Sequence, residues 1–283
     1  MTRQEILRKI YNELDDLPPI PESIAKIRRM INDPKSDIIK IGELVKQDAS
    51  LTADILRVAN SAWYMSRSHI DNVDRAIAMI GLRRLSAITL TIGAKKVIKD
   101  RYPAMEQTWR HSYKCAFFAM NLMKLKSKHD EDIELAYVSG LLHDMGKFVI
   151  LSLSPSLIEG ITAMSKAKHV SITEIEKQAL GFNHAEIGQK VATRWKFPPL
   201  LTLAIGFHHA PLSAPDEDKT AHLVYTTYLA NILSKEQQDS EDIMNSVEAK
   251  VLDYYDMADS ETFKTHYDKL NDQYAIAPEI KYF

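Results

Sequence analysis

The feature that most constrains the fold is the spacing of apolar residues, which recur three or four positions apart along almost the whole chain. An early example is the series Ile24, Ile27, Met30 and Ile31, which would place its side chains on one face of an α-helix. The 283 residues include only 9 glycines, and alternating strand patterns joined by Asn-Gly or Asp-Gly turns are absent. The sequence therefore predicts an all-α protein of many short helices, and no internal repeat suggests a solenoid.

Composition and charge narrow the class of protein further. The chain is 45% hydrophobic and 26% charged, which is typical of a soluble globular protein with a sizeable core. The formal net charge of -2 does not favour a nucleic-acid partner bound through phosphates. No apolar run reaches the roughly 18 residues of a membrane span, and the charged start is not a signal peptide. Since Cys115 is the only cysteine, an internal disulfide is excluded, and we expect a cytoplasmic protein.

Three regions follow one another along the chain. Residues 1 to about 105 form a helical region without metal-ligand chemistry. Residues from about 106 to 235 hold most of the histidines, and a polar linker then leads into a charged, aromatic tail. Within these regions several helix starts are marked by side chains that can cap a helix or begin one. They are Asp48 or Ser50, the prolines of "FPPLL" at 197–201, and Asn183 with Glu186, which can form a capping box.

Two His-Asp pairs differ in their surroundings. His129-Asp130 lies in the polar stretch "KLKSKHDEDIE", where a solvated loop explains it. His143-Asp144 closes the apolar run "AYVSGLLHD", where burial of an ionised carboxylate is costly without a partner. This second pair therefore requires a metal ion, or cations and hydrogen-bond donors, nearby.

Other histidines lie near the ends of separate predicted helices. His111 lies on an amphipathic helix, where it could instead bond to backbone, and His184 opens another helix, where it could simply serve that terminus. His208 and His209 end an apolar segment, and we expect one of the two to point away because adjacent helical side chains diverge by roughly 100°. Imidazole is a common ligand for Zn, Fe, Mn and Ni, and an aspartate can bridge two ions.

Gly146 and Lys147, which follow the His143-Asp144 pair, add to this interpretation. Lys147 could meet an anionic phosphate as a point charge. Gly146 is expected to let the chain turn sharply just past the end of a helix.

The order of these histidines resembles the HD superfamily of metal-dependent phosphohydrolases, and it is most similar to the HD-GYP branch. The motifs "LPPIPESIAKIRRMINDP", "IGELVKQDASLTADILRVANSAWY", "DNVDRAIAMIGLRRLSAITL" and "GFNHAEIGQKVATRWKFPPLLTLAIGFHH" resemble the HDOD family, the HD-related output domain of bacterial signalling proteins. The resemblance implies an N-terminal helical bundle packed on an HD-like helical core. It predicts an HDOD domain over residues 12–212, with subdomains meeting at about 105–106 and a last core helix reaching about 235. Residues 236–283 would then be a C-terminal helical extension.

The resemblance also implies a metal site and its residues. The implied ligands of one or two divalent ions (Fe, Mn, Zn or Ni), if metal is bound at all, are His111, His143, Asp144, His184, His208 and His209. If the protein is an active hydrolase, Asp144 and Lys147 would be its catalytic residues.

One implied ligand is missing from the sequence. HD phosphohydrolases have a further aspartate on a later helix, and aligning "YLANIL" puts Thr227 near that position. No acidic residue occurs between Lys219 and Lys235, and the "GYP" tripeptide is absent after His209. A neutral hydroxyl is a poorer ligand than a carboxylate, so both losses weigh against hydrolysis without excluding metal binding.

Two functions from different classes remain open. The favoured one is a regulatory HDOD protein that is not catalytic and acts on other signalling proteins or by self-association. The alternative is a metal-dependent phosphohydrolase or phosphodiesterase acting on a nucleotide or cyclic dinucleotide. A nucleotide could also bind in a groove without being cleaved.

Overall fold

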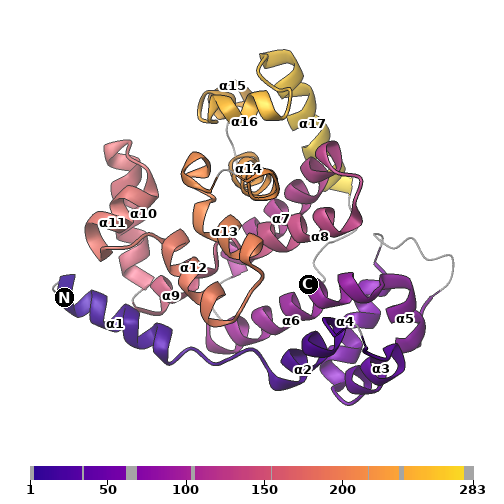
Figure 1. The fold of residues 1–283 in the computed structure, drawn as a ribbon. Helices are drawn as coiled ribbons and strands as arrows, with labels where there is room; N and C mark the ends of the chain where they lie inside the picture. The colour runs from indigo at the N-terminus through magenta and orange to yellow at the C-terminus, as the bar shows by residue number, and fades with distance from the viewer. Residues whose placement is uncertain are drawn as a thin grey trace. The chain divides into compact units, whose positions relative to one another are not determined.

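A computed structural model describes residues 3–33, 35–61, 69–102, 106–153, 155–215, 217–235 and 239–276. Every regular element in these residues is helical (Figure 1), which confirms the predicted all-α class. Trp63 and Tyr64 of the quoted "ANSAWY" segment lie outside the described residues.

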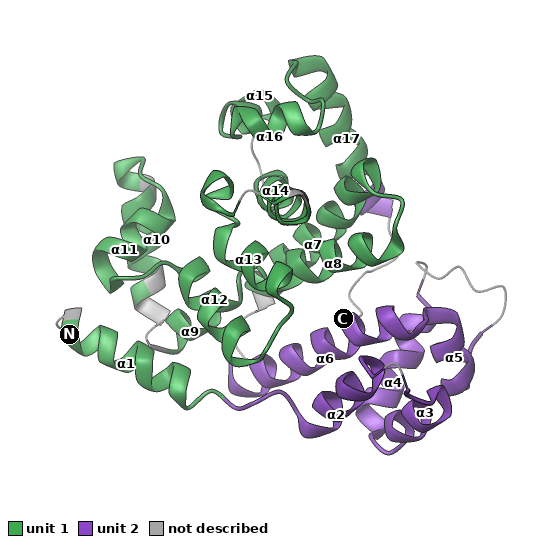
Figure 2. Ribbon diagram, viewed as in Figure 1, with its two compact units in different colours: residues 1–17, 104–272 green, residues 18–103, 273–283 purple. Residues whose placement is uncertain are grey.

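The helices fall into two compact units (Figure 2), each described here by itself. One comprises Met1–Leu17 and Ala104–Asp272, and the other contains Pro18–Pro103. The first helix of the chain, α1 (Arg3–Asp15), thus belongs to the unit that holds the histidines and not to the region that follows it in sequence. The predicted domain limits at 12, 212 and 235 stay predictions.

The described part of the smaller unit between residues 18 and 102 contains five helices. They are α2 (Glu22–Ile31), α3 (Ile38–Lys46), α4 (Ala49–Ala59), α5 (Val73–Ile80) and α6 (Leu82–Arg101). A side chain caps the start of α3, α4 and α5. Of the two predicted caps for α4, Asp48 is the one used, since its side chain accepts the Leu51 N–H. Asn72 caps α5 in the same way, and Gly81, with φ of 83°, joins α5 to α6.

No single helix in the described part of the chain is long and apolar enough to cross a membrane. The bent pair α5 and α6, at 110° to each other, meets the length and composition requirements jointly.

The larger unit is built around the hairpin of α7 (Glu106–Lys126) and α8 (Asp130–Leu142), and α14 (Asp218–Leu233) packs on both helices. The exposed His129 and Asp130 lie at the start of α8. The other helices of this unit are α9 (Met145–Leu153), α10 (Pro155–Lys168), α11 (Ile172–Leu180), α12 (His184–Arg194), α13 (Pro199–Phe207), the 3-10 helix η1 (Pro211–Ser213), α15 (Ser240–Asn245), α16 (Ala249–Tyr254) and α17 (Ser260–Ile276). The predicted capping box of Asn183 and Glu186 opens α12, and Pro199 opens α13 as expected.

Gly146 has a different role from the predicted sharp turn. It lies inside α9 and does not have a positive φ, so that prediction was wrong. A Cβ at this position would lie 1.9 Å from the His184 carbonyl oxygen and 2.6 Å from the Gly188 nitrogen. The absence of a side chain instead allows α9 to approach the backbone of α12, which brings His184 toward the His143-Asp144 pair.

We expect Gly146→Ala to lower the free energy of unfolding by about 1–3 kcal/mol or more, because the methyl group would collide with backbone that cannot move independently. Gly160→Ala is the matched control: Gly160 lies in α10, and a Cβ there would meet no atom within 4 Å. That change should be neutral or stabilise by about 0.5–1 kcal/mol. Urea unfolding of both variants checks this, and equal stabilities would contradict the proposed close helix contact.

Candidate metal centre

The structure brings all six predicted metal ligands together in the larger unit. His111 comes from α7, His143 and Asp144 from the junction of α8 with α9, and His184 from the first position of α12. His208 and His209 directly follow α13. The six residues form two groups that share Asp144, and within each group the potential ligand atoms all lie within 4.8 Å of one another.

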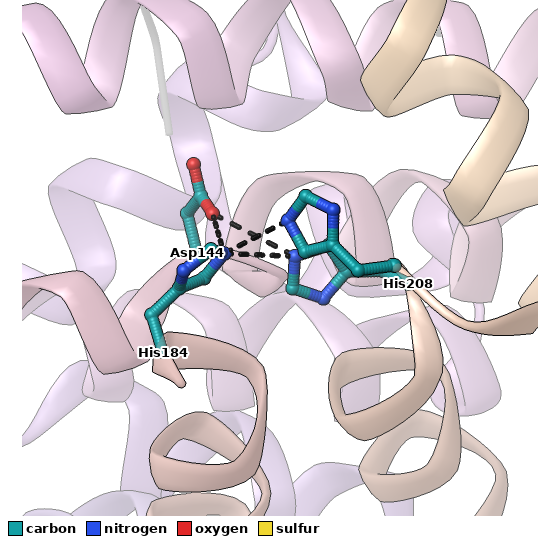
Figure 3. Close-up of side chains that lie close together, drawn as sticks. Asp144, His184 and His208 are labelled. Carbon is teal, nitrogen blue, oxygen red and sulfur yellow. Dashed lines mark hydrogen bonds and ion pairs between the residues drawn. The ribbon is translucent and has the colours of Figure 1, made fainter. Parts of the chain in front are cut away.

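The first group, which we call the three-histidine half, consists of Asp144 with His184, His208 and His209. The Asp144 Oδ1 atom lies 3.2 Å from Nε2 of His184 and 3.7 Å from Nε2 of His208. The Nε2 atom of His184 is also 3.3 Å from Nε2 of His208 and 3.0 Å from Nε2 of His209. Figure 3 shows Asp144, His184 and His208 converging from different segments of the chain.

The second group, the two-histidine half, consists of Asp144 with His111 and His143. Here the other carboxylate oxygen, Oδ2, lies 3.3 Å from Nε2 of His143 and 3.7 Å from Nε2 of His111. The two Nε2 atoms are 3.3 Å apart. Each oxygen of one carboxylate therefore faces its own set of imidazole nitrogens.

Hydrogen bonds at the far side of the rings orient three histidines. The Nδ1 atom of His143 lies 2.7 Å from the Gly140 carbonyl oxygen, and that of His208 lies 2.7 Å from the Ile205 carbonyl oxygen. The Nδ1 atom of His184 lies 2.7 Å from a carboxylate oxygen of Glu176, which also accepts the His184 backbone N–H. Because each Nδ1 must donate to its oxygen, the Nε2 atom of each neutral ring presents a lone pair to the cluster.

Asp144 is the only carboxylate in either group, and its side chain is 1% exposed. Burial raises the pKa of Asp144, but the neighbouring His143 and Lys147 outweigh it and hold that pKa well below its usual range. Among the described residues, no group donates a hydrogen bond to Oδ1. A buried, ionised oxygen is costly without a cation close by, and Oδ1 together with the facing Nε2 atoms of His184 and His208 could coordinate a metal ion.

The histidine pKa values divide in a way that also favours a bound cation. Burial lowers the pKa of His208 and His209 well below the usual range and that of His111 to about 3, so these rings are neutral and can act as ligands. Burial also lowers the pKa of His143 and His184, but nearby carboxylates raise it by more. Asp144 raises the pKa of His143 to about 10, and Glu176 with Asp144 raises that of His184. The cluster thus attracts positive charge in the form of protons or of metal.

The donor set and its spacing fit a divalent metal. Imidazole nitrogens bind zinc at about 2.0–2.1 Å, so two of them on one tetrahedral ion lie about 3.3 Å apart. The nitrogen–nitrogen distances of 3.0 to 3.3 Å in this cluster match that separation. The residues present therefore suit a divalent metal ion.

The structure corrects two predictions about the site. Both His208 and His209 face the three-histidine half, although one was expected to point away. The expectation assumed continuous helix, whereas α13 ends at Phe207 and the two histidines lie in the turn that follows.

The second correction concerns the position of the missing aspartate. The Thr227 hydroxyl donates to the Leu223 carbonyl oxygen and lies 2.7 Å from Oγ of Ser139. Asn231, one helical turn later on α14, contacts the cluster instead: its Oδ1 is 3.1 Å from Nε2 of His111. The alignment with Thr227 was therefore wrong by one helical turn. Residues four apart lie on the same helix face, so the helical period alone does not distinguish Thr227 from Asn231.

Sequence reasoning missed two residues of the site. Glu176 holds His184 from α11, and its side chain is 3% exposed. Asn231 is a buried amide in the apolar segment "YLANIL". A polar residue in an apolar helical run was a signal for Asn231, whereas nothing local distinguishes Glu176 from Glu174, the other glutamate of α11.

Lys147 lies beside the carboxylate and not out in solvent. Its Nζ is 2.6 Å from Oδ2 of Asp144, and its side chain is 26% exposed. The predicted contact between Lys147 and a phosphate stays a prediction.

Comparisons with known proteins agree with this architecture. A Treponema pallidum (strain Nichols) protein of uncharacterized function is 29% identical over 228 residues, which cover 81% of this chain and 44% of that protein. The chain thus spans less than half the length of this relative. An HDOD domain protein of unknown function from Geobacter sulfurreducens has a TM-score of 0.73 at 21% identity, with 96% of this chain and 95% of that chain covered.

A second solved structure, named "Putative phosphohydrolase", comes from Shewanella amazonensis SB2B. It has a TM-score of 0.71 at 23% identity and covers 94% of both chains. At such identities the two structures support the fold alone. The sequence profile of the HDOD domain matches residues 17–211, more than half of the chain, and this protein therefore belongs to the HDOD domain family.

Proposed function

We propose that the protein is a regulatory HDOD protein that binds divalent metal at the His/Asp cluster and acts through contacts with other signalling proteins or with itself. The observation that supports it is the convergence of the Nε2 atoms of His184 and His208 on Oδ1 of Asp144, a buried carboxylate oxygen. A metal ion there would neutralise the carboxylate and link α9, α12 and the turn after α13. Metal binding would therefore stabilise the larger unit.

The neutral residue on α14 favours regulation over hydrolysis. Asn231 is the α14 side chain that contacts His111, and it offers an amide oxygen in place of a carboxylate. An amide oxygen neutralises none of the charge of a bound ion, so the two-histidine half is poorer in negative charge than an all-acid site. A nucleotide bound without cleavage remains compatible with this role.

A second candidate is a metal-dependent phosphohydrolase acting on a nucleotide or cyclic dinucleotide. It is favoured by the two oxygens of Asp144, each of which faces a separate set of histidines. Metal held by these residues would supply Lewis acidity toward a phosphate. Lys147, as a partly exposed cation beside Asp144, would neutralise a phosphate oxygen of the substrate.

Metal binding is tested by the thermal stability of the protein before and after chelation. Chelation of the native protein should lower Tm by several degrees, because an ion that binds only the folded state stabilises it. His184→Ala should bind metal at least ~10-fold more weakly and lose most of the Tm response. His129→Ala is the matched control, since His129 is exposed at the start of α8, and it should respond like the native protein. If the native protein contains no metal and chelation does not change its Tm, the proposal is contradicted.

The corrected position of the missing acid gives a second prediction. Asn231→Asp should tighten the binding of an ion next to His111 by ~10-fold or more, since it adds a carboxylate there. Thr227→Asp should instead destabilise the fold by about 1–3 kcal/mol, because it places a charge where a buried hydroxyl bonds to Leu223 and Ser139. Isothermal titration and thermal unfolding of both variants decide the point. Tighter binding in Thr227→Asp alone would restore the original alignment.

Hydrolysis is separated from regulation by turnover of phosphodiester and nucleotide substrates with added Mn²⁺ or Fe²⁺. On the regulatory proposal, native protein and Asp144→Ala show the same background rate. Turnover that native protein shows and Asp144→Ala loses would establish the hydrolase instead, provided that circular dichroism shows both to be folded.

A further inference from the structure

The two halves of the cluster are unequal because the two oxygens of Asp144 have different partners. Oδ2 forms an ion pair with Lys147 at 2.6 Å. Within the described residues, no donor reaches Oδ1, which faces His184 and His208. The carboxylate is therefore paired with an ammonium on the side of the two-histidine half, whereas only imidazole nitrogens lie close to it on the other side.

Lys147 is held next to Asp144 by local structure. The two residues are three positions apart at the start of α9, and the Lys147 backbone N–H donates to the Asp144 carbonyl oxygen at 2.9 Å. This turn directs the lysine side chain back over the carboxylate. The contact needs no rearrangement of neighbouring helices, so the ammonium is a resident cation of the two-histidine half.

The number of potential ligands also favours the three-histidine half over the two-histidine half. The three-histidine half offers three imidazoles and a carboxylate oxygen with no hydrogen-bond donor in the described structure. The two-histidine half offers two imidazoles, a carboxylate oxygen paired with Lys147, and the neutral amide oxygen of Asn231. Three nitrogens and one oxygen are a complete tetrahedral set for zinc, whereas an ion in the other half would meet fewer charges and a repelling ammonium.

We propose that this chain binds a single divalent ion, in the three-histidine half, and that the Lys147 ammonium replaces a second ion beside Oδ2 of Asp144. This inference rests on the metal binding proposed above and specifies its stoichiometry and position. It makes Lys147 the residue that keeps the site mononuclear.

The test is a titration of metal-free protein with Zn²⁺, and in parallel with Mn²⁺, followed by calorimetry and by metal analysis of the washed protein. The native chain should bind one ion tightly and a second at least ~10-fold more weakly. Lys147→Met should tighten the second ion by ~10-fold or more, because it removes the repelling charge. Lys190→Met is the matched control: it removes the same charge from an exposed position on α12 and should change neither affinity.

Two further variants locate the tight ion. His209→Ala should weaken it by ~10-fold or more, because a ligand is lost. His111→Ala should change it by less than ~3-fold, because that ring belongs to the other half. If Lys147→Met fails to fold by circular dichroism, the double change of Asn231→Asp with His209→Ala replaces it, and its remaining ion should then depend on His111.

The outcomes separate this inference from the function on which it rests. One tight ion that His209→Ala weakens and His111→Ala leaves intact supports both. Two ions of equal affinity in the native chain overturn the single-ion inference and leave the metal-binding function standing. No bound ion overturns both, and a tight ion that depends on His111 but not on His209 overturns the assignment to the three-histidine half.

Discussion

The larger unit depends on how it compensates the buried carboxylate of Asp144. An ionised group in the interior is stable only with opposite charge or donors close by. Lys147 supplies a charge to one oxygen, and the imidazole nitrogens of His184 and His208 face the other. The same arrangement that makes the carboxylate costly in the protein alone makes it a strong anchor for a metal ion.

The fold places these groups through backbone contacts as much as through the ligands themselves. Gly146 allows α9 to approach α12 within a distance that no side chain would permit. Glu176 then fixes the ring of His184 from α11 through both its Nδ1 and its backbone nitrogen. Ligands from four parts of the chain thus converge because helices that bear no ligand, such as α11, position those that do.

These features are compatible with a site that retains metal chemistry but has changed in charge. A neutral amide on α14 and a lysine against the carboxylate both reduce the attraction for a second ion. On the proposed function, a metal ion bound there would hold together the segments that carry its ligands.

Much of this could be predicted from the residues in order. Helical spacing, caps such as Asp48 and Asn183, and the contrast between the two His-Asp pairs are local signals, and the structure agrees with them. Two predictions were wrong because the ends of the helices do not lie where the local sequence pattern suggested. The two histidines after α13 both face the site because the helix has already ended, and Gly146 serves a helix contact because it lies inside α9, beyond the turn at His143 and Asp144.

The sequence by itself determined the helical class, the family and the list of histidines, because periodicity and motifs are properties of neighbouring residues. Only the tertiary structure decided which side chain of α14 reaches His111, which oxygen of Asp144 pairs with Lys147, and which glutamate holds His184. The contacts of Asn231 with His111 and of Glu176 with His184 join residues on different helices, and positions one turn apart on the same face look alike in sequence. The physical reason is that the helical period specifies a face of each helix, whereas packing alone specifies the level at which two faces meet.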